Sequence, residues 1–433
     1  MPVWAFRLPH LMKTSNLTRT ESLVSASRGD AIKGLPFLLA ALTALTALSI
    51  DMSLPAMPRL KEIFGSTEGM IQLTLSLFML GYSVGQLVCG PLSDRVGRRP
   101  VLLGGLAVFA LAGFGCAIAP SLPVLIALRL VQGMGASVGA ILGRAIVRDK
   151  FEGREASGVM SQITQVMILA PLVAPTLGGY LLQAFGWHSI FLFLGIAGLA
   201  VASLSFAKLP ETIRQRRTES GYVGQVFRGF GQALAHRSTR RHVLTTMFAS
   251  AGMFSYISGS PFVIIGVFKV PEGQFGMVFS LTAAALMVGA TLNRRLLSIW
   301  EPTRLLRFGV SIVAAAASLL ILCTAFQWGG IYGVMGPMMV YLFGLGMVMP
   351  NASAAAMEPH PHMAGLVSSL MGGLQTLAGA VAGFAVGSFF DGTTRSLGFT
   401  AGAMGLLALL FLERTSVTAA KEIELGEETV AIE

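Results

Sequence analysis

The chain has 433 residues, of which 54% are hydrophobic and only 12% are charged, and its mean hydropathy is +0.71. Soluble globular proteins carry charge on about a quarter of their residues, so this composition excludes that class. The formal net charge of +10 does not indicate nucleic-acid binding, because the basic residues gather in short segments between apolar runs. Three cysteines, all in apolar stretches, predict neither a disulfide framework nor a metal cluster.

Twelve apolar segments follow a polar N-terminal tail at residues 1–34, and most reach the ~20 residues that a membrane-spanning helix needs. One long basic interruption, residues 209–242, separates six segments from six. We therefore predict an all-α membrane protein with two pseudo-symmetric six-helix bundles, at 35–208 and 243–412, and a substrate site between them. We expect the acidic tail at 413–433 to be disordered. The predicted spans are 35–57, 70–92, 100–119, 124–147, 157–182, 189–208, 243–266, 273–293, 305–325, 329–352, 364–388 and 396–412.

The polar turn Gly90–Pro100 reads GPLSDRVGRRP and joins the second and third spans. A charged group at bilayer depth costs about 2.5 to 3.5 kcal/mol, so this turn must lie at a membrane surface. Its arginines Arg95, Arg98 and Arg99 place it on the cytoplasmic side by the positive-inside rule, and both termini then lie there too. The alternative is an ordinary basic turn with no special role.

Asp51 is the one acid that we place well within a span. Such a carboxyl is a functional-site candidate. Burial and a nearby cation shift the pKa of a carboxyl in opposite directions, so the group can gain and lose a proton as its surroundings change. Arg129 is its natural counterpart, since both lie roughly 9 Å from the outer ends of their spans at 1.5 Å per residue. The alternatives are a structural acid capping a helix break near Pro55, and an arginine that snorkels to the headgroups.

The fifth span contains two prolines four residues apart and a glycine pair. These residues would kink and thin the helix, and could make a hinge or a seal between the halves. A plain kink is the alternative. The residues concerned are Pro171, Pro175, Gly178 and Gly179.

These elements together resemble the major facilitator superfamily and its drug:proton antiporters. The Arg129 stretch resembles their fourth-helix motif, and Ala174–Gly179 resembles their fifth-helix motif, with alanine at 170 and 174 where glycine is usual. The loop between helices 2 and 3 of the superfamily is matched at Gly90, Asp94, Arg95, Gly97, Arg98 and Arg99.

Further stretches resemble the bicyclomycin and chloramphenicol resistance (Bcr/CflA) branch, and the resemblance covers residues 35 to about 412. It implies that Asp51 and Arg129 serve proton coupling and that Asp94 stabilises the outward-facing state. Arg144 and Arg148 could be partners of Asp94 or a plain basic flank. The stretches that carry this resemblance are Asp51–Pro58, Ile71–Ser76, Ala251–Phe262 and Pro361–Gly365.

Polar and aromatic side chains within the spans are candidates for the substrate cavity, because a few polar groups in an apolar, methionine-rich cavity suit a moderately hydrophobic drug. Taken singly, each of them fits helix packing better. The candidates are Tyr82, Gln86, Gln162, Gln165, Met253, Phe254, Tyr256, Tyr341 and Gln375.

The sequence therefore predicts a monomeric inner-membrane exporter of small amphiphilic drugs, such as bicyclomycin- or chloramphenicol-like compounds. It would work by alternating access, with the proton gradient as its drive and no cofactor. An exporter of an endogenous metabolite is the first alternative. A membrane enzyme would need several reactive groups at one depth, and a sensor would need a folded soluble domain; the sequence favours neither. The pair His360 and His362 lacks further ligands, so we predict no metal site.

Overall fold

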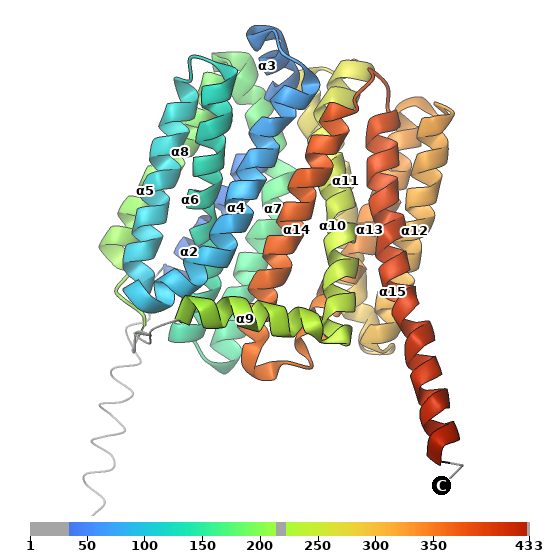
Figure 1. Cartoon of the computed structure of the whole chain (residues 1–433). Coiled ribbons are helices and arrows are strands. Elements are labelled where there is room, and N and C mark those ends of the chain that lie inside the picture. The colour runs from blue at the N-terminus through green and yellow to red at the C-terminus, as the bar shows by residue number, and fades with distance from the viewer. Residues whose placement is uncertain (1–33, 214–221, 431–433) are drawn as a thin grey trace, which may run out of the picture.

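The computed structural model describes residues 34–213 and 222–430. Within this part of the chain the regular structure is helical, and twelve helical segments are long and apolar enough to cross a membrane. The predicted all-α class and twelve spans are confirmed (Figure 1). The predicted N-terminal tail, apart from Gly34, lies outside the described residues.

The first half contains six membrane segments, the first of which is broken. Helix α2 ends at Asp51, and a 3₁₀ turn with Pro55 follows. Helix α3 ends at Phe64 and is followed by Gly65, whose positive φ of 55° is easily adopted by glycine. Thr67 caps the next helix by accepting a hydrogen bond from the Met70 N–H. The elements are α2 (Leu35–Asp51), η1 (Leu54–Ala56), α3 (Met57–Phe64), α4 (Glu68–Val96), α5 (Arg98–Ala117), α6 (Leu122–Lys150), α7 (Gly153–Phe185) and α8 (His188–Lys208).

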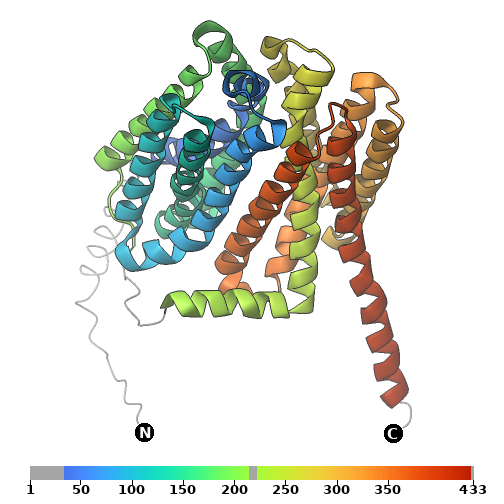
Figure 2. The same cartoon turned by 45° about the horizontal axis from the view of Figure 1, so that its top comes forward.

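The second half repeats this plan after an additional helix, α9, that lies across one end of the bundle (Figures 1 and 2). The predicted basic loop at 209–242 is partly wrong, since it contains α9 and the seventh span begins at Arg237; residues 214–221 lie outside the described part. The elements are α9 (Tyr222–Ala235), α10 (Arg237–Pro261), η2 (Phe262–Val267), α11 (Glu272–Leu296), α12 (Pro302–Ala325), α13 (Gly330–Met357), η3 (Pro361–Met363), α14 (Ala364–Ser388) and α15 (Arg395–Val430).

The acidic tail also differs from our expectation. Helix α15 continues beyond the predicted span, which ends at residue 412, as far as Val430, and it projects from the bundle (Figure 1). The helix-forming residues Ala, Lys, Glu and Leu make up half of residues 413–430, so the local propensity is compatible with a helix.

The contacts between helices show the pseudo-symmetry directly. In the first half α4 and α5 each pack on α6, α5 packs on α8, and α2 packs on α7 and α8. In the second half α11 and α12 each pack on α13, α12 packs on α15, and α10 packs on α14 and α15. The two halves meet along two equivalent seams, α4 with α14 and α7 with α11. This is the arrangement of two repeated six-helix bundles.

The two halves meet differently at the two ends of the molecule. At the end opposite α9, η1 and α3 of the first half contact α10, α11 and η2 of the second. At the other end, which we call the α9 end, the apolar face of α9 packs against α10 and α14 through Phe230 and Ala233. A cavity lies between the halves at this α9 end.

Candidate functional site

Asp51 is the last residue of α2, where the first span changes from α-helix to the 3₁₀ turn η1. The residue is only 3% exposed. The carbonyl oxygen of Ile50 accepts a hydrogen bond from the Ser53 hydroxyl at 2.9 Å, so Ser53 rather than Asp51 serves the end of this helix. No described residue makes an ion pair or a side-chain hydrogen bond with Asp51. The structural alternative, an acid that caps the helix break, therefore finds no support.

Arg129 is 1% exposed and lies in the core of the first half. Its guanidinium donates hydrogen bonds to the carbonyl oxygens of Ser49 (2.9 Å) and Thr74 (3.2 Å) and to the side chain of Gln132 (2.8 Å). It also lies over the ring of Phe78, 4.2 Å from its centroid. These contacts connect α2, α4 and α6. The alternative of an arginine that snorkels to the headgroups is wrong, because its charged group points into the protein.

Asp51 and Arg129 are not partners in this structure. Arg129 reaches the backbone of Ser49, two residues before Asp51 on the same helix. No ion pair joins them among the described residues, so matching depth has not produced contact in this conformation. The site therefore consists of a fixed cation and a separate buried acid.

The fifth-helix motif borders this site. A Cβ atom at Gly178 would collide with the carbonyl group of Met52, so only glycine lets α7 lie so close to the residue after Asp51. Gly179 faces the other half, where a Cβ would lie 3.1 Å from the carbonyl oxygen of Glu272. Pro171 and Pro175 lie within α7, which is continuous from 153 to 185. The motif thus lies on the α7–α11 seam, and its role as hinge or seal stays a prediction.

The Gly90 turn is held by an ion-pair network at the α9 end. Arg98 is 5% exposed and pairs with Asp94 at 2.6 Å and with Asp149, at the end of α6, at 3.2 Å. The carboxylate of Glu211 accepts hydrogen bonds from the backbone N–H groups of Arg98 (2.9 Å) and Arg99 (3.3 Å) at the start of α5. Arg98 and Glu211 therefore fix the ends of α4, α5 and α6 beside the segment after α8.

Gly97 makes the approach of Glu211 possible. Its φ of 124° lies in the region that favours glycine, and a Cβ there would collide with the Glu211 carboxylate. Partial burial raises the pKa of Glu211, but four backbone N–H donors, from Ile213, Arg98, Thr212 and Arg99, together outweigh burial and hold the pKa below its ordinary value. Glu211 is thus ionised at neutral pH and acts as a cap for α5. Arg95 is exposed.

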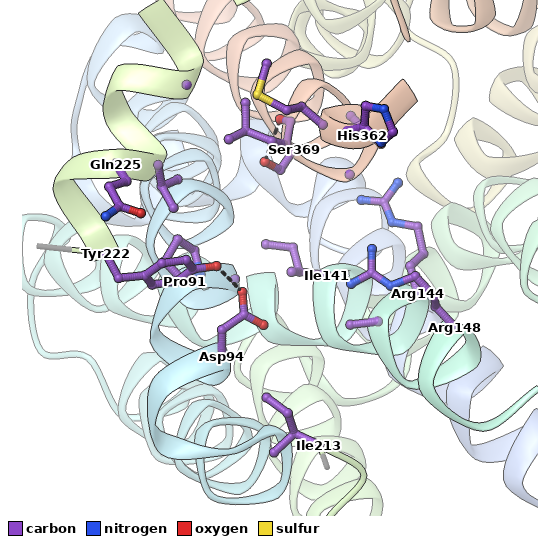
Figure 3. A pocket seen from close by; sticks show the side chains of 18 of the residues that line it. Pro91, Asp94, Ile141, Arg144, Arg148, Ile213, Tyr222, Gln225, His362 and Ser369 are labelled. Carbon is purple, nitrogen blue, oxygen red and sulfur yellow. Dashed lines mark hydrogen bonds between the residues drawn. The ribbon is translucent and has the colours of Figure 1, made fainter. Parts of the chain in front are cut away.

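Asp94 pairs neither with Arg144 nor with Arg148, the two partners suggested by the sequence. Its Oδ1 binds Arg98, and its Oδ2 accepts a hydrogen bond from the Tyr222 hydroxyl at 2.7 Å (Figure 3). Arg144 donates from Nε to the carbonyl oxygen of Ala140 at 3.1 Å. The partner of the Gly90 turn across the cavity is therefore α9.

The cavity at the α9 end has a volume of about 790 Å³. It is bounded by the ends of α4 and α6, by α9 and by the start of α14 (Figure 3). We call it the α9-end cavity; its polar lining consists of Asp94, Arg98, Arg144, Arg148, Tyr222, Gln225, Gln232, His362, Ser368 and Ser369.

The predicted substrate contacts do not gather around this cavity. The hydroxyls of Tyr256 and Tyr341 are satisfied inside the second half, by Thr282 at 3.2 Å and by the carbonyl of Ala249 at 2.9 Å. The remaining candidates are distributed as follows: Tyr82 and Gln86 are buried in α4, Phe254 packs at Gly379, Met253 and Gln375 are partly buried, and Gln162 and Gln165 are exposed on α7. Their role as substrate contacts stays a prediction.

Sequence reasoning missed three residues of the site. Asp149 and Glu211 meet Arg98 only because three helix ends converge, and no sequence spacing indicates this. Tyr222 could have been found, since Tyr222, Val226, Phe230 and Ala233 recur at helical spacing within the segment interpreted as a loop.

The model of the Major Facilitator Superfamily matches residues 39–383, and the chain belongs to this family. It is therefore a transporter and not an enzyme, and a multi-pass protein of the inner membrane.

Three relatives are similar along most of their length. The chain is 36% identical to an uncharacterized MFS-type transporter YdgK of Bacillus subtilis, over 82% of this chain and 88% of the relative. It is 32% identical to a bicyclomycin resistance protein homolog of Haemophilus influenzae (86% and 93%) and 33% identical to a chloramphenicol resistance protein of Pseudomonas aeruginosa (77% and 78%). The resemblance to the bicyclomycin and chloramphenicol resistance branch is confirmed.

Among solved structures, the fold is similar to that of the xylose transporter XylE from E. coli in a partially occluded inward-open conformation. The TM-score is 0.67 at 16% identity, over 88% of this chain and 97% of the other. At this identity the likeness shows the shared fold.

Proposed function

We propose that this protein exports small amphiphilic drugs of the bicyclomycin or chloramphenicol type by exchanging them for protons. Two observations support the substrate class: relatives named for resistance to these antibiotics match over three quarters of the chain or more, and the spans carry few charges. The proposal of proton coupling rests on one observation: Asp51 is 3% exposed and has no ion-pair partner among the described residues.

The physical argument concerns the cost of the buried charge. An ionised carboxylate taken out of water without a partner costs several kcal/mol, roughly 2.5 to 3.5 on insertion scales, so the closed surroundings of Asp51 favour the neutral form. A conformation that hydrates Asp51 would favour release of the proton. Arg129 is held in the core of the same half by its own hydrogen bonds to Gln132 and Ser49. Asp51 can therefore couple its protonation to the conformation of the carrier.

The orientation follows from the positive-inside rule. The α9 end carries Arg95, Arg98 and Arg99, and we place it in the cytoplasm together with both termini. The halves pack together at the opposite end, where Gly179 lies against Glu272, and leave the α9-end cavity between them. The present conformation is then inward-facing.

The transport cycle follows from these assignments. Release of the Asp51 proton to the cytoplasm favours substrate binding, and the halves then rock to open the outer side. Protonation of Asp51 from that side displaces the substrate and resets the carrier. One charge that crosses a potential of 100 mV supplies about 2.3 kcal/mol for this cycle.

Accumulation of labelled chloramphenicol in energised cells tests the proposal. Cells with the native protein should accumulate less drug than cells without it, and Asp51→Asn should abolish the difference. Glu301→Gln, which changes an exposed acid at the start of α12, is the matched control and should behave like the native protein. If neither chloramphenicol nor bicyclomycin is exported by the native protein, the drug assignment fails and export of an endogenous metabolite replaces it.

A further inference from the structure

The α9-end cavity has positive charge that the fold does not neutralise. Among the described residues that line it, Asp94 is the only carboxylate. Both oxygens of Asp94 are engaged, one with Arg98 and the other with the Tyr222 hydroxyl. Arg98 is in turn shared with Asp149. Arg98 is therefore fully paired, and the other two arginines of the lining carry the charge that lacks a partner.

Arg144 and Arg148 are one turn apart on α6 and are both exposed. The Nε of Arg144 binds the carbonyl of Ala140, but the terminal nitrogens of both guanidinium groups have no hydrogen-bond or ion-pair partner among the described residues. Figure 3 shows both side chains directed from α6 toward the side of the cavity where His362 lies. Two adjacent guanidinium groups offer paired N–H donors, which fit the oxygens of a phosphate or carboxylate.

The opposite wall adds polar groups without negative charge. The start of α14 contributes Ser368 and Ser369, and α9 contributes Gln225 and Gln232. A Cβ on Gly365 would lie 3.2 Å from Arg148 Nη1, so the α14 backbone approaches the arginines closely. A ligand on the arginines would therefore contact both halves of the transporter. The volume of about 790 Å³ lies within the range of small-molecule sites, about 300–1,000 Å³.

We infer that the α9-end cavity binds an anionic group, a phosphate or a carboxylate, between Arg144 and Arg148 on α6 and the start of α14. The group can belong to a phospholipid headgroup or to a soluble anion, since both present the same oxygens to the guanidinium donors. Because the ligand would bridge the two halves, it would favour the present conformation over those in which the halves have moved. This inference does not depend on proton coupling at Asp51.

A binding measurement on the purified full-length protein in detergent tests the inference. Bound phosphatidylglycerol is counted by native mass spectrometry against phosphatidylcholine, and inorganic phosphate is titrated at constant ionic strength while the melting temperature is followed. In the variant R144Q/R148Q the affinity for the anionic probe should fall about tenfold or more, as expected when charge-assisted hydrogen bonds are lost. The matched control R294Q/R295Q removes two exposed arginines at the end of α11, outside the cavity, and should bind like the native protein.

The outcomes distinguish a site for lipid headgroups from a site for soluble anions. Arginine-dependent binding of phosphatidylglycerol alone identifies a lipid headgroup site, and arginine-dependent binding of phosphate identifies a site for soluble anions. The inference is overturned if R144Q/R148Q binds both probes as well as the native protein, or if R294Q/R295Q loses as much affinity. Should R144Q/R148Q fail to fold, R144K/R148K keeps the charge but lacks the planar donor fork. Several-fold weaker binding by that variant supports the inference, and unchanged binding overturns it.

Discussion

The guanidinium of Arg129 donates a hydrogen bond to the carbonyl oxygen of Ser49 at 2.9 Å, only two residues before Asp51, yet the Asp51 carboxyl remains without an ion-pair partner among the described residues. Arg129 is thus held in the core by its hydrogen bonds, whereas Asp51, which is 3% exposed, makes no such contact among the described residues. The two residues that the sequence suggests as a pair therefore differ in their contacts, and their roles stay a prediction.

Arg129→Gln should destabilise the first half of the protein. The variant loses the hydrogen bonds that Arg129 donates to the carbonyl oxygens of Ser49 and Thr74. It also leaves the side-chain oxygen of Gln132 buried without a donor, which costs about 1–3 kcal/mol. Thermal unfolding of the purified protein should show a clearly lower melting temperature. Arg154→Gln, an exposed arginine at the start of α7, provides the comparison and should leave the melting temperature unchanged. Equal melting temperatures for the two variants would show that the Arg129 hydrogen bonds contribute nothing.

Gly178→Ala should separate α7 from the break in the first span. The added Cβ would collide with the Met52 carbonyl, and relief of such overpacking costs about 1–3 kcal/mol. Gly158→Ala lies on the same helix and meets nothing within 4 Å, so it should be neutral or slightly stabilising. The two melting temperatures provide the test, and a Gly178→Ala protein as stable as Gly158→Ala would contradict the close packing described for this helix pair.

Tyr222→Phe should weaken the attachment of α9 to the Gly90 turn. The variant loses the hydroxyl that donates to Asp94 at 2.7 Å, a hydrogen bond worth about 1.5–3 kcal/mol because its acceptor is charged. Hydrogen exchange of the amides in 222–235 should therefore become faster by about ten- to hundredfold. Tyr332→Phe, which alters an exposed tyrosine, should leave this exchange unaltered. Unchanged exchange in Tyr222→Phe would mean that the apolar face of α9 alone holds the helix in place.

The contribution of Glu211 to the stability of the protein should depend on pH. Its pKa in the folded protein lies below the ordinary value of 4.5, so its stabilisation is fully present above that pH and is lost as the pH falls through the folded pKa. Glu211→Gln should lower the free energy of unfolding by about 1 kcal/mol at pH 7, as for the loss of a helix cap, and by less below pH 4.5. Melting curves of both proteins across this pH range measure the effect. A difference that is independent of pH would exclude the ionised carboxylate as its source.

The sequence was a good guide to the spans because their hydrophobic length is a local property. The predicted eleventh span, 364–388, coincides with α14, and most others differ by a few residues at each end. Helix α9 within 209–242 is missed from the sequence because basic residues are frequent in this segment and interrupt the apolar face of the helix. The site was predicted less completely, since Asp149 and Glu211 meet Arg98 through tertiary packing. Likewise, the separation of Asp51 from Arg129 depends on side-chain direction, which depth along a helix does not determine.

Proton release from everted membrane vesicles shows whether Asp51 couples drug export to proton movement. Vesicles that contain the native protein are energised to form a pH gradient and are then given chloramphenicol or a bicyclomycin-like drug. If Asp51 couples transport to protons, the drug should partly collapse the gradient with the native protein and Glu301→Gln but not with Asp51→Asn. Gradient collapse of the same size in the Asp51→Asn vesicles would show that protons move without Asp51, and the proposed coupling would then be wrong.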